Sequence, residues 1–514
     1  MKHLTIPAFR ETNYEEHQEN KNARVYYFSS VAPGAFEDYC ELFEASGFTK
    51  KKEHQIDSHR FAAFFGDGTG IFVNAFGDLQ EMSIVVEQNC TYFSYSDEKG
   101  VPCTTPRITQ IALDEFGMSY VIRLSDGRFI LLDGGREVEA EADKLFTCLQ
   151  QGNVLNGLPV IAAWIMTHPH GDHFHCFMAF MEKYAEQVTI EKFLFLFPEA
   201  DDTAHYPKLM PKETPAIPRM LDWIAQTDAA VYSPHTGQEY RIGDAVCRIL
   251  ASMDDTIHRS QHVNATSLVI RMELGGQVIL WATDAYFRPA QLSRKYGAYL
   301  KSDILQVPHH GFSAGGAQEQ ITAYKLIDAP VCLLPNNDYI AFTWHSIFSN
   351  LSTRYLFADS PVAEVITGEV QRTIDLPYSP RPEAKKELAR KYLTGMKSNG
   401  SPAWVFSDLH TSQPGDLCYT ILNMTRMPVT VQAELYFEDP EQVVRHMTIK
   451  VPAHVLRQVT VTDAQPDELS EETCFRAKKG LPENAAFAIR FLSSDPVVIT
   501  NKSHRESYRA ETVG

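Results

Sequence analysis

Residues 108–380 pass twice through the same order of predicted elements: a β-hairpin, a helix and an apolar strand. The first pass is "YVIRLSDGRFILLD", "EVEAEADKLFTCLQQ" and "PVIAAWIMT", and the second is "SLVIRMELGGQVILWATD", "RPAQLSRKYGAYL" and "DILQV". An Asp-Gly and a Gly-Gly turn mark the two hairpins. Strands that bury one face against each other and are covered by helices on the other predict two β-sheets packed face to face, with helices outside both.

Both passes place polar side chains at the ends of strands. Each hairpin ends in an aspartate, Asp133 in the first pass and Asp284 in the second. The strand that follows ends in histidines, at His168 in the first pass and at His309 and His310 in the second. In a face-to-face arrangement of two related halves, these residues are expected along the same edge of the sheets.

The stretch "HPHGDHFH" holds four histidines and an aspartate within eight positions, 168–175. His168 and His170 are two residues apart in an extended segment, so they can point the same way, whereas Asp172 and His173 lie on the following turn. Imidazole and carboxylate are common ligands of Zn, Mn and Fe. We therefore expect two divalent metal ions, Zn foremost with Mn or Fe as alternatives, and Asp284 bridging between them.

These motifs carry a family resemblance. "HPHGDH" matches the HxHxDH signature of the metallo-β-lactamase fold, and "WATDA" and "VPHHG" follow it in the order of that family. With "NATSLVIRM" ahead of them, the last two resemble the branch that includes the hydrolase domains of DNA-uptake proteins and the phosphorylcholine esterases. The resemblance covers about residues 108–380 and implies an α/β fold, the αββα metallo-β-lactamase sandwich.

Carried over residue by residue, the resemblance implies a set of metal ligands: His168, His170, Asp172, His173, Asp284 and His310. The first two would hold one ion and the others the second, with Asp284 shared. His310 is preferred to His309 as a ligand because it directly precedes Gly311, as in the last histidine motif of the family. His309 would then face the substrate, and Asp133 would orient a ligand histidine through its other ring nitrogen.

The third protein ligand of the first ion departs from the plain family pattern. His262 is the first candidate and His258 a weaker one, but this branch often has an asparagine nearby, which Asn264 matches. His345 lies where the branch often carries a histidine close to the pocket, and it is a candidate for substrate contact.

The expected chemistry is hydrolysis. Water held between two divalent ions has a pKa of about 7, so the bridging hydroxide that it forms is available as a nucleophile at neutral pH. Asp172 can orient this hydroxide, and His309 can protonate the leaving group or donate to a phosphoryl oxygen. The resemblance favours a small-molecule substrate, a phosphodiester or another ester.

Two other functions have to be weighed. "GFSAG" matches the G-x-S-x-G motif of serine hydrolases, with Ser313 as nucleophile, but that motif needs a strand running straight into the serine turn and "PHHG" intervenes. The second alternative is a non-catalytic metal- or ligand-binding sensor or scaffold. The near-complete ligand set argues against it.

The flanking regions predict further domains. Residues 1–105 alternate strand-like and helical segments of a small α+β domain, in which "GDGTG" is a hairpin turn because no Lys-Ser/Thr follows. A charged linker is expected at 381–400. Residues 401–514 contain seven short strand-like runs, typical of a β-sandwich. Through "WVFSD", "LYFEDPE" and "SSDPVVIT" they resemble the sensory-rhodopsin transducer family, which implies ligand recognition or homo-oligomer assembly.

Composition limits the partners. The formal net charge of -18 disfavours nucleic acid, whose binding depends on Lys and Arg at phosphates. Neither a secretory signal nor an apolar run of membrane-spanning length occurs. Nine scattered cysteines fit reduced thiols. We therefore expect a cytoplasmic protein with no membrane partner.

Overall fold

The structure is a computed structural model, and it divides the chain into two compact units, Met1–Asn337 with Asn350–Arg381, and Asp338–Ser349 with Pro382–Gly514. The residues that the structure describes are 14–93, 100–114, 116–199, 215–255, 262–285, 289–312, 317–336, 352, 355–356, 360–381, 383–384, 401–410, 412, 417–423, 425, 427–439, 445–453, 455–460, 485–501 and 508–509.

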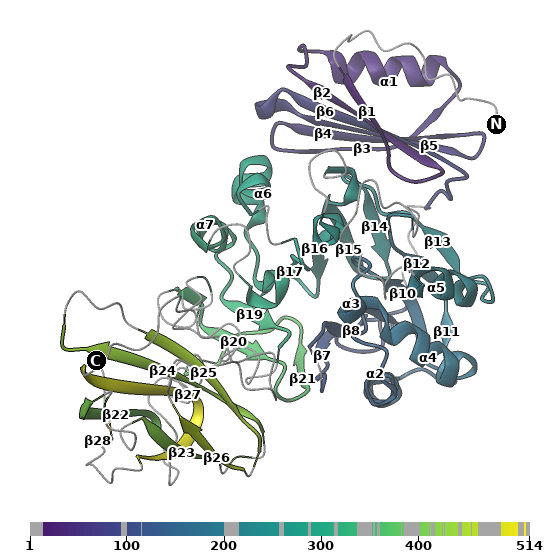
Figure 1. Ribbon diagram of the computed structural model, residues 1–514. Helices are drawn as coiled ribbons and strands as arrows, with labels where there is room; N and C mark the ends of the chain where they lie inside the picture. The colour runs from purple at the N-terminus through teal and green to yellow at the C-terminus, as the bar shows by residue number, and fades with distance from the viewer. Residues whose placement is uncertain are drawn as a thin grey trace. The chain divides into compact units, whose positions relative to one another are not determined.

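The first unit begins with a six-stranded antiparallel sheet in the order β1-β2-β6-β5-β4-β3, which a helix covers on one face (Figure 1). Its elements are β1 (Tyr14–Gln18), β2 (Ala23–Ser29), α1 (Ala35–Ala45), β3 (Thr49–Ile56), β4 (His59–Gly66), β5 (Thr69–Phe76) and β6 (Glu81–Gln88). Phe36, Tyr39 and Phe43 of α1 recur at helical spacing and join the apolar residues of the sheet in one core. The β4–β5 hairpin confirms that "GDGTG" is a turn.

Two further sheets make up the rest of this unit. One has eight strands, namely β7 (Arg107–Gln110), β8 (Ser119–Arg123), β9 (Phe129–Asp133), β10 (Val160–Ile165), β11 (Thr189–Ile190), β12 (Lys192–Leu194), β13 (Ala230–Tyr232) and β21 (Arg372–Asp375). The other has seven, namely β14 (Glu239–Ile242), β15 (Ala245–Ala251), β16 (Val269–Leu274), β17 (Gln277–Trp281), β18 (Ile304–Gln306), β19 (Val331–Leu334) and β20 (Glu364–Thr367). We call this pair of sheets the sandwich.

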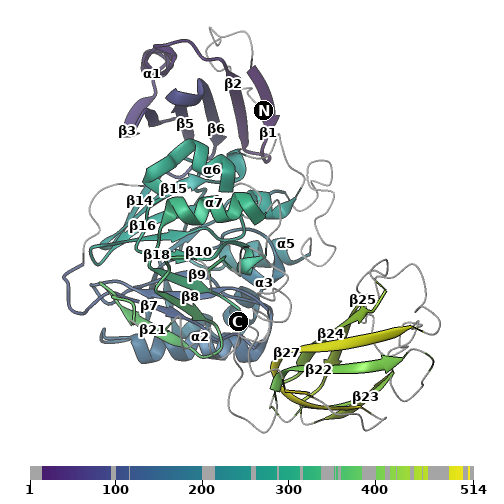
Figure 2. The ribbon, with the colours of Figure 1, turned by 90° about the vertical axis from the view of Figure 1, so that its left-hand side faces the viewer.

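A single apolar core joins the two sheets of the sandwich. Side chains alternate along β9, so that Ile130 and Leu132 enter this core while Phe129 and Leu131 face the other way. The outward-facing set packs against α2 (Glu139–Gly152), α4 (Cys176–Tyr184) and α5 (Ala216–Ile224). Figures 1 and 2 show α6 (Pro289–Tyr296) and α7 (Ala317–Ile327) on the opposite side of the sheets. The architecture is thus mixed α/β and rich in strands, and its layers agree with those expected from the repeated pattern.

The repeated order of elements is confirmed. β8 and β9 form an antiparallel hairpin that leads through α2 to β10, which lies parallel to β9. β16 and β17 form the second hairpin, which leads through α6 to β18, parallel to β17. In each half, two parallel strands therefore have their carboxyl ends side by side at one edge of the sheet. These are β9 and β10 in the first half and β17 and β18 in the second.

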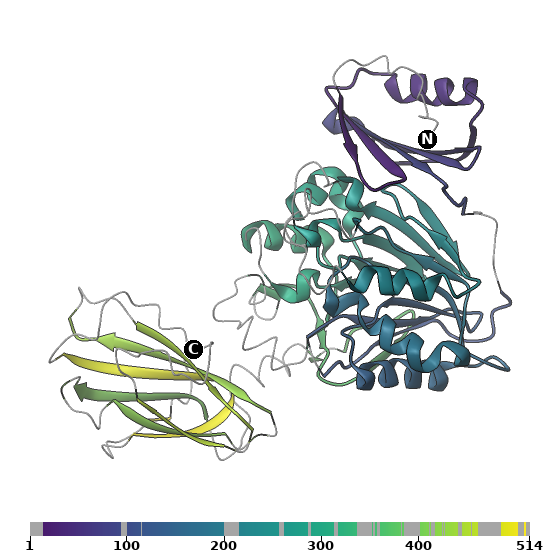
Figure 3. The same cartoon turned by 45° about the vertical axis from the view of Figure 1, so that its right-hand side comes forward.

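The second unit holds a seven-stranded antiparallel arrangement (Figure 3). Its strands are β22 (Ser401–His410), β23 (Cys418–Asn423), β24 (Val429–Phe437), β25 (Arg445–Val451), β26 (Leu456–Thr460), β27 (Ala486–Asn501) and β28 (Tyr508–Arg509). The last two of the seven predicted strands, "AAFAIRFLS" and "PVVITNK", form one continuous strand, β27, so the prediction of a break between them was wrong. β27 pairs with β24 up to Ser493 and with β23 from Val497, so it changes partners beside Pro496, which has no N–H to donate.

Most of the expected linker at 381–400, and the segment 338–349, lie outside the described residues. Of the helices that the structure describes, none has both the length and the apolar character needed to cross a membrane.

The N-terminal sheet packs closely on the loop that precedes β14. Gly237 in this loop has φ +83, and a Cβ there would lie 2.4 Å from Cδ1 of Phe61 and 2.5 Å from Oδ1 of Asn74. We predict that Gly237→Ala lowers the free energy of unfolding by about 2–4 kcal/mol, because both the backbone conformation and the contact with the sheet are strained. Urea unfolding measures this.

Gly276→Ala is the matched control, since Gly276 has φ +79 but open space around its Cβ position. This substitution should lower the free energy of unfolding only by the cost of the left-handed backbone conformation, about 1–2 kcal/mol. Equal effects of the two substitutions would mean that close packing against the N-terminal sheet contributes nothing.

In the second unit, Asn423 is fully buried at the end of β23. Its Nδ2 donates to the carbonyls of Met427 (2.7 Å) and Val451 (3.0 Å), and its Oδ1 accepts from the N–H of Thr425 (2.9 Å). We predict that Asn423→Ala lowers the free energy of unfolding by at least about 2 kcal/mol, because these buried groups lose their partners. The half-buried Gln432→Ala, measured alongside by urea unfolding, should stay within about 0.5 kcal/mol of the wild type.

Candidate metal centre

The six residues predicted as ligands of the two ions, together with Asp133, come together at the strand ends of the sandwich. Asp133 is the last residue of β9, and His168 and His170 follow β10. Asp284 follows β17, and His310 lies in the turn after β18. Asp172 and His173 belong to the short helix α3 (Gly171–Phe174), which begins directly after His170. Both halves of the repeat therefore contribute side chains to one place.

Two groups of three side chains there have ligand atoms within 4.8 Å of one another: His168, His170 and Asp284 form one group, and Asp172, His173 and His310 form the other. This division is the one that the family resemblance implies for two ions. The His168, His173 and His310 side chains are fully buried.

Ring nitrogens face each other within both groups. Nε2 of His168 lies 3.1 Å from Nδ1 of His170, and Nε2 of His173 lies 3.2 Å from Nε2 of His310. Zn–N bonds of about 2.05 Å in a tetrahedral site separate two ligand nitrogens by about 3.3 Å. Converging imidazole nitrogens at this spacing fit a shared cation.

Asp284 lies between the two groups. Its Oδ2 is 3.7 Å from Nε2 of His168, while its Oδ1 is 3.4 Å from Nε2 of His173 and 3.5 Å from Nε2 of His310. Oδ1 is buried and has no hydrogen-bond partner among the described residues. A buried carboxylate oxygen without a donor is costly unless a cation compensates it, so this oxygen also fits a metal ion.

Asp133 fixes the orientation of the His173 ring through the Nδ1 atom of that ring. Its Oδ2 accepts from Nδ1 of His173 at 2.7 Å and from the hydroxyl of Thr167 at 2.8 Å, and its Oδ1 accepts from the N–H of Thr167 at 2.8 Å. The proton on Nδ1 leaves the lone pair of Nε2 directed at the site. The Thr167 hydroxyl also lies 3.2 Å from Nδ1 of His168, which is therefore the donor to it. Asp133 thus orients two histidines, one of them through Thr167.

The protonation states of His168, His170 and Asp284 suit metal binding. Burial, followed by the charge on His173, lowers the pKa of His168 well below its usual value, and burial also lowers the pKa of His170. Burial opposes ionisation of Asp284, but His173, His310 and His309 together outweigh it and keep the pKa of that carboxyl well below its usual value. Neutral imidazole and ionised carboxylate are the forms that bind metals. For His173, burial opposes the charged form, but Asp284, Asp133 and Asp172 raise its pKa well above its usual value, so an ion bound there would displace the proton on Nε2.

Four residues at the site have left-handed backbones although none is glycine: Asp133 (φ 57), Thr283 (φ 47), His309 (φ 47) and His310 (φ 52). Each such residue costs on the order of 1–3 kcal/mol, and such strain concentrates at functional sites. The turn of His309 and His310 is held by hydrogen bonds from the His309 N–H to the carbonyl of Thr283 (2.7 Å) and from Asn336 Nδ2 to the carbonyl of His310 (2.8 Å).

His309 differs from His310 in exposure. The side chain of His309 is 18% exposed and its Nε2 lies 3.9 Å from Oδ2 of Asp284, whereas the side chain of His310 is fully buried. Burial lowers the pKa of His309 to about 4, so the ring is neutral at neutral pH and can donate one N–H.

The candidates for the third ligand of the first group differ in burial. Asn264 is buried in the 3-10 helix η4 (Val263–Thr266), and its Oδ1 has no hydrogen-bond partner among the described residues. His262 is exposed and belongs to neither group of ligand atoms. His258, His345 and Ser313 lie outside the described residues, and their assigned roles stay predictions.

Sequence reasoning missed three residues that shape the site. Thr167 links Asp133 to His168, Asn336 holds the carbonyl of His310, and the ring of Phe116 lies 4.2 Å from the ring of His310. The position of Thr167 directly before the histidine motif could have indicated its role. Asn336 and Phe116 come from distant parts of the chain and carry no such signal.

Neither a family model nor a curated protein matches the chain. Solved structures that it resembles include an Anabaena sensory rhodopsin transducer, with 22% identity, TM-score 0.17, and coverage of 21% of this chain and 84% of that one. The flavodiiron protein from Giardia intestinalis has 10% identity, TM-score 0.24, and coverage of 54% and 50%. A beta-lactamase domain protein from Burkholderia ambifaria has 14% identity, TM-score 0.24, and coverage of 37% and 57%. TM-scores of this size do not establish a common fold.

We predict that Asp133→Asn weakens Zn²⁺ binding about 10–100-fold, since an amide cannot accept from His173 and Thr167 as the carboxylate does. Competition with a chromogenic chelator measures the affinity. Asp303→Asn is a control, because Asp303 also accepts a backbone N–H, from Val278 at 2.8 Å, but has no histidine partner in the structure described. Unchanged affinity in Asp133→Asn would show that His173 does not need this hydrogen bond to bind metal.

Proposed function

We propose that the protein is a metal-dependent hydrolase with two divalent ions, acting on a phosphodiester or another small-molecule ester. The observation that carries this proposal is the pair of buried His/Asp groups with Asp284 between them. In each group the donor atoms converge, and the donor types are those of hydrolytic metal sites. The motif resemblance described above supports the same conclusion.

The residues divide into those that hold the ions and those that handle the reactants. His168, His170 and Asp284 would hold one ion, and Asp172, His173 and His310 the other, again with Asp284. When bound, two divalent ions lower the pKa of water and neutralise negative charge that builds on the attacked centre.

Asp172 is the carboxylate in the better position to orient the attacking water. Its side chain is 13% exposed, compared with 2% for Asp284, and its Oδ2 lies 3.2 Å from Nε2 of His310. One carboxylate oxygen can therefore serve the metal group while the other accepts a proton from water.

His309 is the proposed contact to the leaving group. It is adjacent to the ligand His310 but keeps more exposure, and its Nε2 lies on the Asp284 side of the site. A neutral imidazole N–H donates to a phosphoryl or leaving-group oxygen, which stabilises charge there. The combination of cations and one N–H donor suits a phosphodiester, whose non-bridging oxygens are anionic.

Zn is the first choice of metal because imidazoles supply most of the donor atoms. Mn and Fe are alternatives, since carboxylates contribute to both groups and Asn264 is better placed by burial than His262 to complete the first group. The second unit is proposed to bind a ligand or to assemble subunits, and the small-molecule substrate would be bound by the first unit.

The test is turnover of bis(p-nitrophenyl) phosphate by full-length protein that has been stripped of metal and reloaded with Zn²⁺ or Mn²⁺. We predict that Asp284→Asn lowers kcat by more than the roughly 100-fold seen when residues behind metal ligands are changed, and that it also lowers the metal content. Circular dichroism should show an unchanged fold. Full turnover in Asp284→Asn would contradict the two-ion assignment.

Two controls separate the alternatives. Ser313→Ala should keep turnover, and its loss would favour the serine-hydrolase alternative. Metal binding at full stoichiometry, without turnover of any phosphodiester or carboxylic ester in the screen, would favour the non-catalytic sensor or scaffold.

A further inference from the structure

A third group of metal-ligand type lies away from the strand ends described above, where the N-terminal sheet meets the sandwich. Glu19, His235 and Asp254 have ligand atoms within 4.8 Å of one another. Glu19 follows β1, His235 precedes β14, and Asp254 lies in the 3-10 helix η3 (Met253–Asp255). The group therefore joins parts of the chain that belong to different sheets.

The imidazole of His235 is the centre of the group. Its Nδ1 lies 2.9 Å from Oδ1 of Asp254 and 3.8 Å from Oε2 of Glu19, and its Nε2 lies 3.3 Å from Oε2 of Glu87 in β6. The side chains of Glu19 and His235 are fully buried, that of Asp254 is 1% exposed and that of Glu87 9%.

Glu19 is the member whose polar atoms are not satisfied. The second oxygen of Asp254 accepts from the N–H of Thr236 at 2.8 Å, and that of Glu87 accepts from the hydroxyl of Ser233 at 2.5 Å. In contrast, neither carboxylate oxygen of Glu19 accepts a hydrogen bond from a donor among the described residues, and the side chain faces His235 and the carboxylate of Asp254.

The charges of the group do not balance. Three carboxylates surround one imidazole, so the buried group keeps a net negative charge even when His235 is protonated. Burying an uncompensated carboxylate costs several kcal/mol, and either a proton or a cation must compensate it. In the absence of a cation, burial and the neighbouring Asp254 raise the pKa of Glu19 well above its usual value.

We infer that Glu19, His235 and Asp254 form a structural site for one divalent transition-metal ion, such as Zn²⁺ or Mn²⁺, that ties the N-terminal sheet to the sandwich. One imidazole and two carboxylates are a donor set that both ions accept, and the two carboxylates balance the charge of a divalent ion. Glu87 would accept from Nε2–H of His235 and so orient the ring, with its Nδ1 toward the ion. The inference does not depend on the proposed hydrolytic function.

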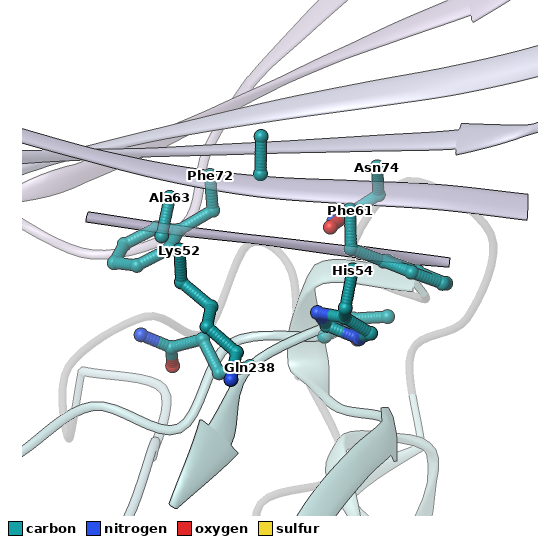
Figure 4. Close-up of a pocket in the computed structure, with 10 residues that line it drawn as sticks. Lys52, His54, Phe61, Ala63, Phe72, Asn74 and Gln238 are labelled. Carbon is teal, nitrogen blue, oxygen red and sulfur yellow. The ribbon is translucent and has the colours of Figure 1, made fainter. Parts of the chain in front are cut away.

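The surroundings of the group are closely packed, as a structural site requires. The ring of His235 lies against the ring of Phe72 of β5, with 4.7 Å between the ring centroids. Figure 4 shows Phe72 on the sheet and Gln238 on the loop after His235, both lining one small pocket at this contact. Gln238 accepts from the N–H of His235 at 2.6 Å, which holds the loop in place.

The experiment compares metal content between full-length wild type and Glu19→Gln after metal removal and reloading with Zn²⁺ in the presence of a competing chelator. Gln keeps the size of Glu but removes its charge. We expect Glu19→Gln to lose about one equivalent of Zn²⁺ per chain while keeping the ions at the strand ends. Glu15→Gln, on the exposed side chain of a neighbouring glutamate, should keep the wild-type content.

A second measurement needs no variant. Crystals of the wild type loaded with Zn²⁺ should give an anomalous-scattering peak among Glu19, His235 and Asp254. The absence of that peak in crystals whose other sites are occupied, or an unchanged metal content in Glu19→Gln, would overturn the inference and leave a proton on Glu19 as the compensating charge. Metal content and anomalous scattering report on metal binding alone. Their results can therefore be interpreted even if the protein does not hydrolyse bis(p-nitrophenyl) phosphate.

Discussion

The candidate metal centre depends on one buried carboxylate. Asp133 is fully buried at the end of β9, and it accepts from His173 and twice from Thr167, while its own carbonyl accepts from the indole N–H of Trp164 at 3.0 Å. Through these bonds it fixes which ring nitrogens face the site. A buried carboxylate is stable only when such donors surround it, so the end of β9, the end of β10 and the start of α3 are held in one arrangement.

The same edge of the sandwich stores backbone strain. Left-handed conformations at Asp133, Thr283, His309 and His310 change the direction of the chain at the ends of strands. An extended strand would alternate its side chains between the two faces of the sheet, so a sharp change of direction is needed to bring adjacent residues such as His309 and His310 to one centre. The free energy gained by burying the two large apolar cores of the sandwich offsets the cost of these strained conformations.

The layered fold and the ligand groups could be predicted because their signals are local. Alternation along β9, the two-residue turns and the spacing of the histidine motif all lie within a few residues of sequence. What could not be predicted depends on contacts between distant segments. In the sequence, Glu19 is one residue of a charged N-terminal stretch, and only the fold shows that it is buried beside His235. The break expected inside β27 is absent because the strand pairs with β24 before Pro496 and with β23 after it. The choice between His262 and Asn264 is of the same kind, since burial separates them and sequence spacing does not.

The ligand groups draw on both halves of the repeat, and this links metal binding to the assembly of the fold. His168, His170, Asp172 and His173 follow β10, whereas Asp284 and His310 follow β17 and β18. Neither half alone presents a complete group, so an ion would bind tightly only when the two sheets are docked. By mass action, ion concentrations about 100 times the dissociation constant would add about 2.7 kcal/mol to the docked state relative to any partly folded one. Bound ions would thus stabilise only those folding intermediates in which the two sheets are already docked.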